Sequence, residues 1–139
     1  MNLKKNIAYL HYDLLQKLRE LMKSPNYLKT GDAFISYDPD VHQVRISGYM
    51  RMTEISDYDP FLRFLVECTE KSKRPLILDV VNLDYLNSSG ITTLIMFVLT
   101  MKGTSALPVL IKGNKNTFWQ TRSLHNLTKF YPAASIEYV

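Results

Sequence analysis

The chain has 139 residues and a net charge of +4, and apolar residues make up 46% of it. These values are ordinary for a globular domain with its own core, and no apolar run approaches the roughly 18 residues that cross a membrane. The basic residues are scattered, without the interleaved aromatic residues of a nucleic-acid groove. The single cysteine, Cys68, excludes an internal disulfide and fits a reducing compartment. We therefore expect a cytoplasmic protein that binds neither nucleic acid nor a membrane.

The N-terminal segment predicts an amphipathic helix over residues 6–23. Leucine and isoleucine recur at spacings of three and four from Ile7 to Leu21, and charged residues fill the other face. We expect residues 1–30 to form this helix and a connector. Periodicity does not separate packing on the chain's own domain from an interface with a partner or with a second copy in a homodimer. We expect packing on its own domain.

Strands and helices alternate after residue 30. The sequence predicts a hairpin over 33–37 and 44–48, with turn residues between its strands. Asp59 can cap a helix and Pro60 suits its first position, so we expect a helix to start there. Asn116 can cap another helix near the end of the chain. The elements expected after the hairpin are a helix from 59, a strand over 76–81, a helix after 86, a strand over 107–111, a helix to about 130 and a strand over 135–139.

This order of elements predicts an α/β fold. Strands that alternate with helices are joined by right-handed crossovers, which gives a mixed, mostly parallel sheet, and the first hairpin adds an antiparallel part. No linker long enough to separate two domains follows residue 30. We therefore expect one domain over residues 31–139, preceded by the extra N-terminal helix.

The most informative stretch covers residues 76–91. A buried strand ends near Val81, a short polar turn follows, and a helix begins. Asn87 or Ser88 can accept hydrogen bonds from the free amides of the first helical turn. Gly90 carries no side chain, so another backbone or a phosphate can come close.

A hydroxyl at the start of a helix has a specific chemical consequence. Ser88 would lie at the positive end of the helix dipole, beside unpaired amide donors, where the fold would tolerate a phosphate. The phosphate would add nearly two negative charges to an exposed surface and repel a partner that fits the neutral form. The stretch therefore has the chemistry of a switch.

The same stretch resembles the signature of the STAS domain, the fold of bacterial anti-sigma factor antagonists. In that family, a strand carrying an aspartate leads to an aromatic–aliphatic pair, to Asp-Ser-Ser-Gly or Asp-Ser-Thr-Gly, and to an amphipathic helix. The resemblance extends from about Asp32 to Val139. The residues that carry it are Leu78-Asp79 and Leu83-Asp84-Tyr85-Leu86-Asn87-Ser88-Ser89-Gly90-Ile91.

The resemblance implies a non-enzymatic regulator of transcription in a bacterial partner-switching pathway. In the antagonists, a partner that is both serine kinase and anti-sigma factor phosphorylates the serine after the aspartate, and a PP2C-type phosphatase reverses the reaction. The phosphorylated residue would here be Ser88. The switch loop and partner surface would include Asp84, Asn87, Ser89, Gly90 and Ile91.

Two departures from the family pattern leave an alternative open. Asn87 stands where the antagonists usually have an aspartate, and an amide carries no charge and cannot bind magnesium as a carboxylate does. The chain also gains the N-terminal helix and ends without the family's usual final helix. The alternative is a STAS module without phosphorylation, which senses a small ligand or acts as an assembly subunit.

The sequence predicts no catalytic residue, metal site or cofactor. The three histidines lack metal-ligand spacing, and neither a P-loop nor a nucleophile elbow is present. We expect Asp79 to anchor a loop near the switch. Tyr49, Met50 and Met52 form either an apolar patch for a partner or part of the core.

Overall fold

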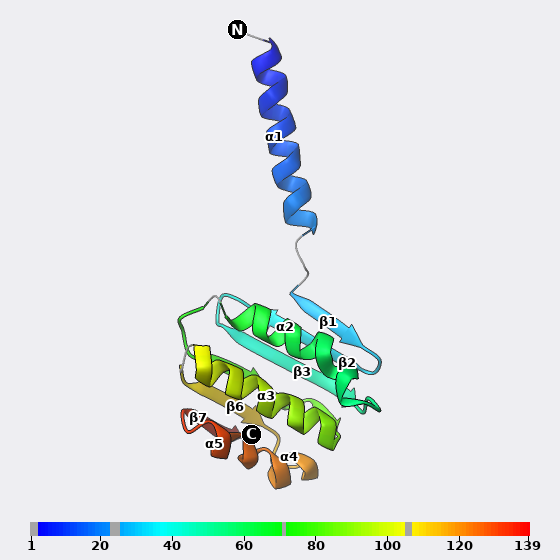
Figure 1. Ribbon diagram of the computed structural model, residues 1–139, viewed down its shortest axis with the longest axis vertical. Coiled ribbons are helices and arrows are strands. Elements are labelled where there is room, and N and C mark those ends of the chain that lie inside the picture. Colours follow the sequence, from blue (N-terminus) through cyan, green and yellow to red (C-terminus); the bar gives the residue numbers. More distant parts are fainter. Residues whose placement is uncertain (1–2, 23–25, 71, 105–106) are drawn as a thin grey trace.

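The computed structural model describes residues 3–22, 26–70, 72–104 and 107–139, with helix residues 3–5 and 17–22 described by their backbone. Its centre is a seven-stranded sheet in the order β1-β2-β3-β4-β6-β7, with β5 paired to β3 beyond the end of β4 (Figure 1). The strands are β1 (Tyr27–Thr30), β2 (Ala33–Asp38), β3 (Gln43–Met50), β4 (Leu76–Asp79), β5 (Leu83–Leu86), β6 (Val109–Gly113) and β7 (Ala134–Tyr138).

The sheet is mixed and mostly parallel. The pairs β1–β2 and β2–β3 are antiparallel, whereas β3 pairs in parallel with both β4 and β5, and β4–β6 and β6–β7 are parallel. The predicted fold class, a mostly parallel α/β sheet preceded by an N-terminal helix, is confirmed.

Strand β3 changes partner along its length. Its first residues pair with β4 and its last ones with β5, and the register shifts between Gly48 and Tyr49. Gly48 has a φ of 93°, and a Cβ there would lie 2.1 Å from the Asp32 carbonyl oxygen, so only glycine fits this bulge. The bulge allows β3 to pair with the strand that leads into the third α-helix.

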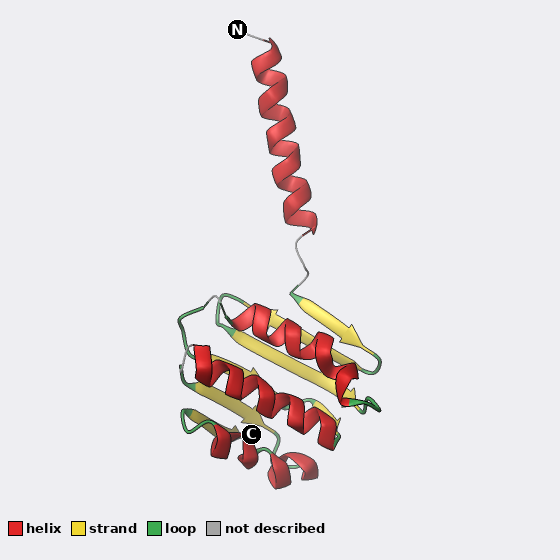
Figure 2. Ribbon diagram, viewed as in Figure 1, coloured by secondary structure: helices red, strands yellow, loops and turns green. Residues whose placement is uncertain are grey.

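The helices of the domain cover one face of the sheet, as Figure 2 shows. They are the 3-10 turn η1 (Ile55–Tyr58), α2 (Asp59–Thr69), α3 (Ser88–Thr104), α4 (Phe118–Ser123) and α5 (His125–Phe130). The apolar face of each strand packs against them, which is why alternate strand residues are buried. Fully buried side chains at the centre of this core include Ile35, Ile46, Phe61, Leu65, Leu78, Leu94, Phe97 and Ile111.

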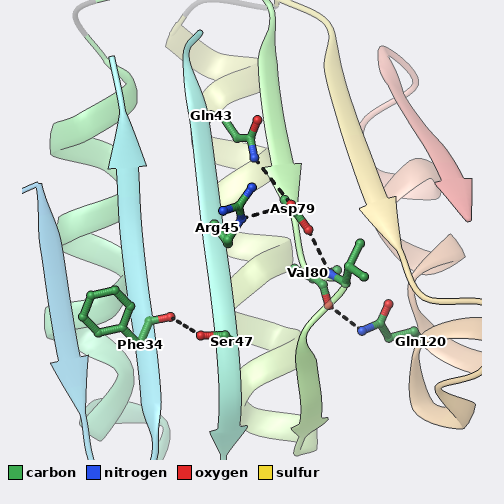
Figure 3. Close-up of polar contacts among 8 residues, drawn as sticks. Phe34, Gln43, Arg45, Ser47, Asp79, Val80 and Gln120 are labelled. Atoms are coloured by element: carbon green, nitrogen blue, oxygen red, sulfur yellow. Dashed lines mark hydrogen bonds and ion pairs between the residues drawn. The ribbon is translucent and has the colours of Figure 1, made fainter. Parts of the chain in front are cut away.

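The other face of the sheet is open and carries a row of charges. Register places Arg45, Asp79, Lys112 and Glu137 side by side on β3, β4, β6 and β7. The Arg45 Nε lies 3.2 Å from the Asp79 Oδ2 (Figure 3). Opposite charges on neighbouring strands favour this register, so this row across the uncovered face is polar.

Helix α1 (Leu3–Met22) projects away from the domain (Figure 1). The apolar side chains described in its middle part are exposed, with 58% of Ile7, 71% of Leu10 and 56% of Leu14 accessible to solvent. The expectation that this stripe packs on its own domain is therefore wrong. A stripe of this kind can equally be covered by another molecule, which sequence periodicity does not reveal.

Several local expectations differ from the structure. Strand β1 lies within the segment expected to be a connector, and β5 lies in the expected turn before α3. Neither Asp59 nor Asn116 caps a helix, since the N-cap residues of α2 and α4 are Tyr58 and Thr117. The last predicted helix is divided into α4 and α5 at Leu124. Among the described helices, none is both long and apolar enough to cross a membrane.

The turn between β2 and β3 contains a buried histidine. His42 is 1% exposed, has a φ of 52°, and lies with its Nδ1 2.6 Å from the Tyr37 hydroxyl. Burial, and then the positive charge of Arg74, lower the pKa of His42 below its usual value. The folded protein therefore binds a proton at this site less readily than the unfolded chain does.

We expect the His42 contribution to stability to be complete above about pH 6.5, the ordinary histidine pKa, and to decrease as the pH falls below it. His42→Asn is a suitable variant, because asparagine tolerates the left-handed backbone at this position. Since it has no imidazole to protonate, its free energy of unfolding should decrease less than that of the wild type between about pH 7.5 and 5. Urea denaturation at several pH values measures this. An unchanged slope in His42→Asn would contradict the assignment.

Candidate functional site at the start of helix α3

Strand β5 leads directly into α3, and Asn87 is the residue between them. Its backbone N–H donates to the Met50 carbonyl at the end of β3, at 3.2 Å, and its own carbonyl accepts from the Ile91 N–H at 3.0 Å. The backbone of Asn87 thus belongs to the sheet on one side and to the helix on the other. This fixes where α3 begins.

The Asn87 side chain joins three elements. Its Oδ1 accepts from the Gly90 N–H at 2.9 Å, which is an N-cap bond, and from the Tyr58 hydroxyl at 2.6 Å. Its Nδ2 donates to the Met52 carbonyl at 2.8 Å. An aspartate could replace the two accepted bonds but not the donated one. The departure from the family pattern therefore has a structural function in this chain.

Tyr58 supports Asn87 from η1. Its side chain is 1% exposed, and its hydroxyl also accepts from the Met52 N–H at 3.4 Å. Burial raises the pKa of Tyr58, so the hydroxyl stays protonated and donates to Asn87. Sequence analysis missed Tyr58, because it lies 29 residues from Asn87 and precedes a helix whose start was assigned to Asp59.

Ser88 is the first residue of α3 and is exposed. Among the described residues, no side-chain or backbone group forms a hydrogen bond with its hydroxyl. Ser89, the next residue, is half-buried. The first turn of α3 contains no acidic residue, and the Asn87 side chain caps the Gly90 amide, which is one of the first amides of a helix that have no partner within the helix.

Gly90 is buried where α3 passes closest to its neighbours. A Cβ at this position would lie 2.1 Å from Leu86 Cδ1 and 3.0 Å from the Tyr58 hydroxyl. The glycine is therefore required by close packing against the side chains of Leu86 and Tyr58, whereas the sequence suggested close approach of another backbone or of a phosphate.

The remaining predicted residues lie around this start. Ile91 is half-buried on α3, and Asp84 is exposed on β5. Within the part of the chain that the structure describes, no hydrogen bond or ion pair joins Asp84 to Ser88. Asp84 therefore belongs to the surrounding surface and not to the hydrogen-bonded centre.

The solvent side of α3 continues from Ser88 as a stripe. Ser88, Thr92, Met96 and Leu99 are all exposed and lie on one side of the helix, at spacings of four, four and three. None of these residues is charged. We call this set the α3 stripe.

A buried amide supports the loop that precedes β5. Gln120 of α4 is fully buried, and its Nε2 donates to the Val80 carbonyl at 2.6 Å (Figure 3). The same Nε2 donates to the Leu83 carbonyl at 3.0 Å. The Trp119 indole N–H donates to the same Leu83 carbonyl at 2.9 Å. Sequence analysis missed Gln120, although its place on the buried stripe with Leu124 could have marked it as a core polar residue.

The residues whose roles the sequence left open have distinct places. Asp79 accepts the Val81 N–H with its Oδ1 at 3.0 Å, which is the contact expected of a loop anchor. Met50 is 1% exposed and belongs to the core, whereas Tyr49 is 47% exposed. Met52 is half-buried.

Two observations concern ligand chemistry. A hollow of about 330 Å³ lies on the open face of the sheet and not at Ser88; it is lined by Ser36, Tyr37, Asp38, Pro39, Gln43 and Arg45. Within the described residues, no three His, Cys, Asp or Glu side chains are grouped to hold a metal ion.

Burial raises the pKa of Cys68 to about 11, so its thiol stays protonated.

We expect Gly90→Ala to destabilise the protein by about 2 kcal/mol, because the new methyl group overlaps Leu86. Gly103 offers a matched control on the same helix, since a Cβ there meets no atom within 4 Å. Gly103→Ala should raise stability by about 0.5–1 kcal/mol through helix propensity. Denaturant unfolding measures both, and equal effects would contradict the packing assignment.

We expect Asn87→Asp to cost about 1–3 kcal/mol, because the Met52 carbonyl loses its donor and faces a carboxylate. The N-cap bond itself is kept, since aspartate caps as well as asparagine. The exposed Asn116→Asp variant provides the control and should be neutral. A wild-type denaturation midpoint for Asn87→Asp would show that the Met52 contact contributes nothing.

The fold is shared with solved structures of proteins from Pseudomonas aeruginosa. A chain of the crystal structure of the diguanylate cyclase SiaD in complex with its activator SiaC matches at a TM-score of 0.63 and 14% identity, over 81% of this chain and 98% of that one. SiaC alone matches at a TM-score of 0.54 and 18% identity, over 84% of this chain and 96% of that one. Apo-SiaC matches at a TM-score of 0.52 and 19% identity, over 84% of this chain and 97% of that one. No protein-family model and no curated protein matches by sequence. The chain has the fold of SiaC.

Proposed function

We propose that this protein is a non-enzymatic signalling regulator that binds a protein partner and is switched by phosphorylation of Ser88. The observation that carries the proposal is the exposed Ser88 hydroxyl at the first position of α3, directly after a residue whose side chain fixes the helix start. A phosphate there would lie at the positive end of a 17-residue helix. The fold would therefore accept the modification without rearrangement.

The α3 stripe is the proposed partner surface. It is uncharged from Ser88 to Leu99, with Met96 and Leu99 each 43% exposed. Exposed methionine and leucine on one helix face suit an apolar partner surface. A phosphate at the head of this stripe adds nearly two negative charges beside apolar groups, which disfavours binding by desolvation cost and by repulsion of any acidic partner group.

The nature of the partner is proposed from two sources. The resemblance to anti-sigma factor antagonists implies a serine kinase that also acts as an anti-sigma factor, a PP2C-type phosphatase and a role in transcription. SiaC, whose fold the chain shares, is the activator of a diguanylate cyclase and forms a complex with it. We therefore propose a signalling protein of one of these classes as the partner.

The absence of catalysis is part of the same proposal. A nucleophilic serine needs a base within hydrogen-bond reach and a group that orients the base. Among the described residues, no histidine or carboxylate forms a hydrogen bond with Ser88. The residue before it, Asn87, uses its amide in three structural bonds.

The modification is tested on protein isolated from its native cells by phosphopeptide mass spectrometry. We expect phosphate on Ser88 in the wild type and none in Ser88→Ala. The half-buried neighbour provides a matched control, so Ser89→Ala should keep the phosphate. A well-covered peptide that never carries phosphate would favour the alternative, a STAS module that senses a small ligand or acts as an assembly subunit.

The effect on binding is tested with Ser88→Glu and a candidate kinase, anti-sigma factor or diguanylate cyclase. We expect a loss of affinity of about tenfold or more, equivalent to 1.4 kcal/mol. Stability should be unchanged or slightly raised, because an acidic residue at the start of a helix is favourable. Ser135→Glu, an exposed serine on the edge strand β7, should bind normally. Equal affinities for all three proteins would contradict the switch.

A further inference from the structure

The hollow of about 330 Å³ on the open face lies over the end of β2 and the start of β3, next to the turn that joins them. Its volume falls at the lower end of the range for small-molecule sites. The helices, and with them the α3 stripe, cover the other face of the sheet. The hollow is therefore separate from the surface that begins at Ser88.

Four polar side chains of the hollow form a square on two adjacent strands. In the antiparallel register of β2 and β3, Ser36 lies beside Arg45 and Asp38 lies beside Gln43. The four share the open face, because Val44, between the two β3 residues, is buried in the core. A cation and a carboxylate thus occupy diagonal corners, at a typical Cα separation of about 7–8 Å.

The two β3 side chains lean away from β2 and toward β4. The Arg45 Nε lies 3.2 Å and the Gln43 Nε2 3.4 Å from the Asp79 Oδ2, as Figure 3 shows. Asp79 is not part of the lining, so the hollow lies on the β2 side of these two residues. Within the described part of the chain, the two terminal Nη groups of Arg45 have no acceptor. They form a planar pair of donors that suits a carboxylate.

The turn after β2 gives the opposite wall a fixed shape. The Asp38 Oδ1 accepts the Asp40 N–H at 2.9 Å. The Arg74 guanidinium donates to the Asp40 carbonyl at 2.8 Å and also to the Pro39 carbonyl. The second carboxylate oxygen of Asp38 has no partner among the described residues. A wall that is ordered before binding reduces the entropy lost when a ligand binds.

The charges around the hollow favour a ligand that carries both signs. A simple anion is attracted by Arg45, but Asp79 already compensates that charge and Asp38 repels the anion. A simple cation is attracted by Asp38 and repelled by Arg45. A zwitterionic α-amino acid offers a carboxylate to the Arg45 Nη groups and an ammonium group to Asp38, and both pairs are charge-assisted hydrogen bonds.

We propose that this hollow binds a free α-amino acid, held by Arg45 at its carboxylate and by Asp38 at its ammonium group. The Ser36 hydroxyl and the Gln43 amide oxygen lie between these two groups and provide further hydrogen-bonding capacity. This proposal does not rest on the modification of Ser88, since the site lies on the opposite face of the sheet.

Binding is tested on the full chain by two-dimensional proton–nitrogen NMR, with each standard α-amino acid titrated singly. We expect at least one to bind with a Kd below about 1 mM. The amide signals of Ser36, Asp38, Gln43 and Arg45 should shift, and those of α3 should not. The absence of a saturable shift with every amino acid would overturn the proposal, and so would saturable shifts confined to residues away from the hollow.

Modified forms of the bound amino acid test the two charges in the wild-type protein, so this test does not depend on the folding of a variant. The N-acetyl form loses the ammonium group, and the methyl ester loses the carboxylate. Each should bind at least about tenfold more weakly than the free amino acid. Equal affinities would overturn the proposal. Inorganic phosphate that binds the same residues as tightly as the amino acid would overturn it in favour of an anion site.

Variants assign the two charges to their residues. Arg45→Gln and Asp38→Asn should each weaken binding of the free amino acid at least about tenfold, and asparagine keeps an oxygen for the Asp40 N–H. Lys112→Gln is the control, because Lys112 lies on the same face but two strands from β3, and it should bind normally. Wild-type affinity in Arg45→Gln or in Asp38→Asn would overturn the proposal.

Discussion

The start of α3 depends on one neutral amide. Asn87 donates to the Met52 carbonyl and accepts from Tyr58 and Gly90, so one side chain joins the segment after β3, the turn η1 and the helix. An amide both donates and accepts, whereas the carboxylate of the usual aspartate lacks the donor. The cap pairs the Gly90 amide, and Ser88, the first residue of the helix, is exposed. The contact that orders the helix start therefore leaves Ser88 accessible.

The sheet brings this amide to its place through an irregularity. The bulge at Gly48 moves the pairing of β3 from β4 to β5, and the backbone between those two strands loses regular ladder partners. Gln120 and Trp119 replace them by donating to the Val80 and Leu83 carbonyls. Buried carbonyls without donors would be costly, so α4 supports, through these bonds, the loop between β4 and β5 and the start of β5.

The sequence was sufficient for the fold class and for the helix start, because strand 76–79 and α3 carry local apolar periods and the run from Asn87 to Gly90 has its own signature. It was not sufficient for contacts between distant residues. Tyr58 meets Asn87 only after the η1 turn is formed, and β1 and β5 are four-residue strands whose identity depends on their neighbours in the sheet. The α1 stripe shows the same limit, since an amphipathic period predicts a covered face but does not name the molecule that covers it.

Helix α1 and the proposed switch occupy separate parts of the molecule. Helix α1 joins the domain at β1, which is the edge strand of the sheet, whereas Ser88 lies after β5, three strands further in. A charge at Ser88 is therefore separated from α1 by the intervening strands β2 and β3, and solvent screens such a charge within about 10 Å. Phosphorylation of Ser88 would therefore change binding at the α3 stripe, which begins at Ser88 itself, and leave the surface of α1 unchanged.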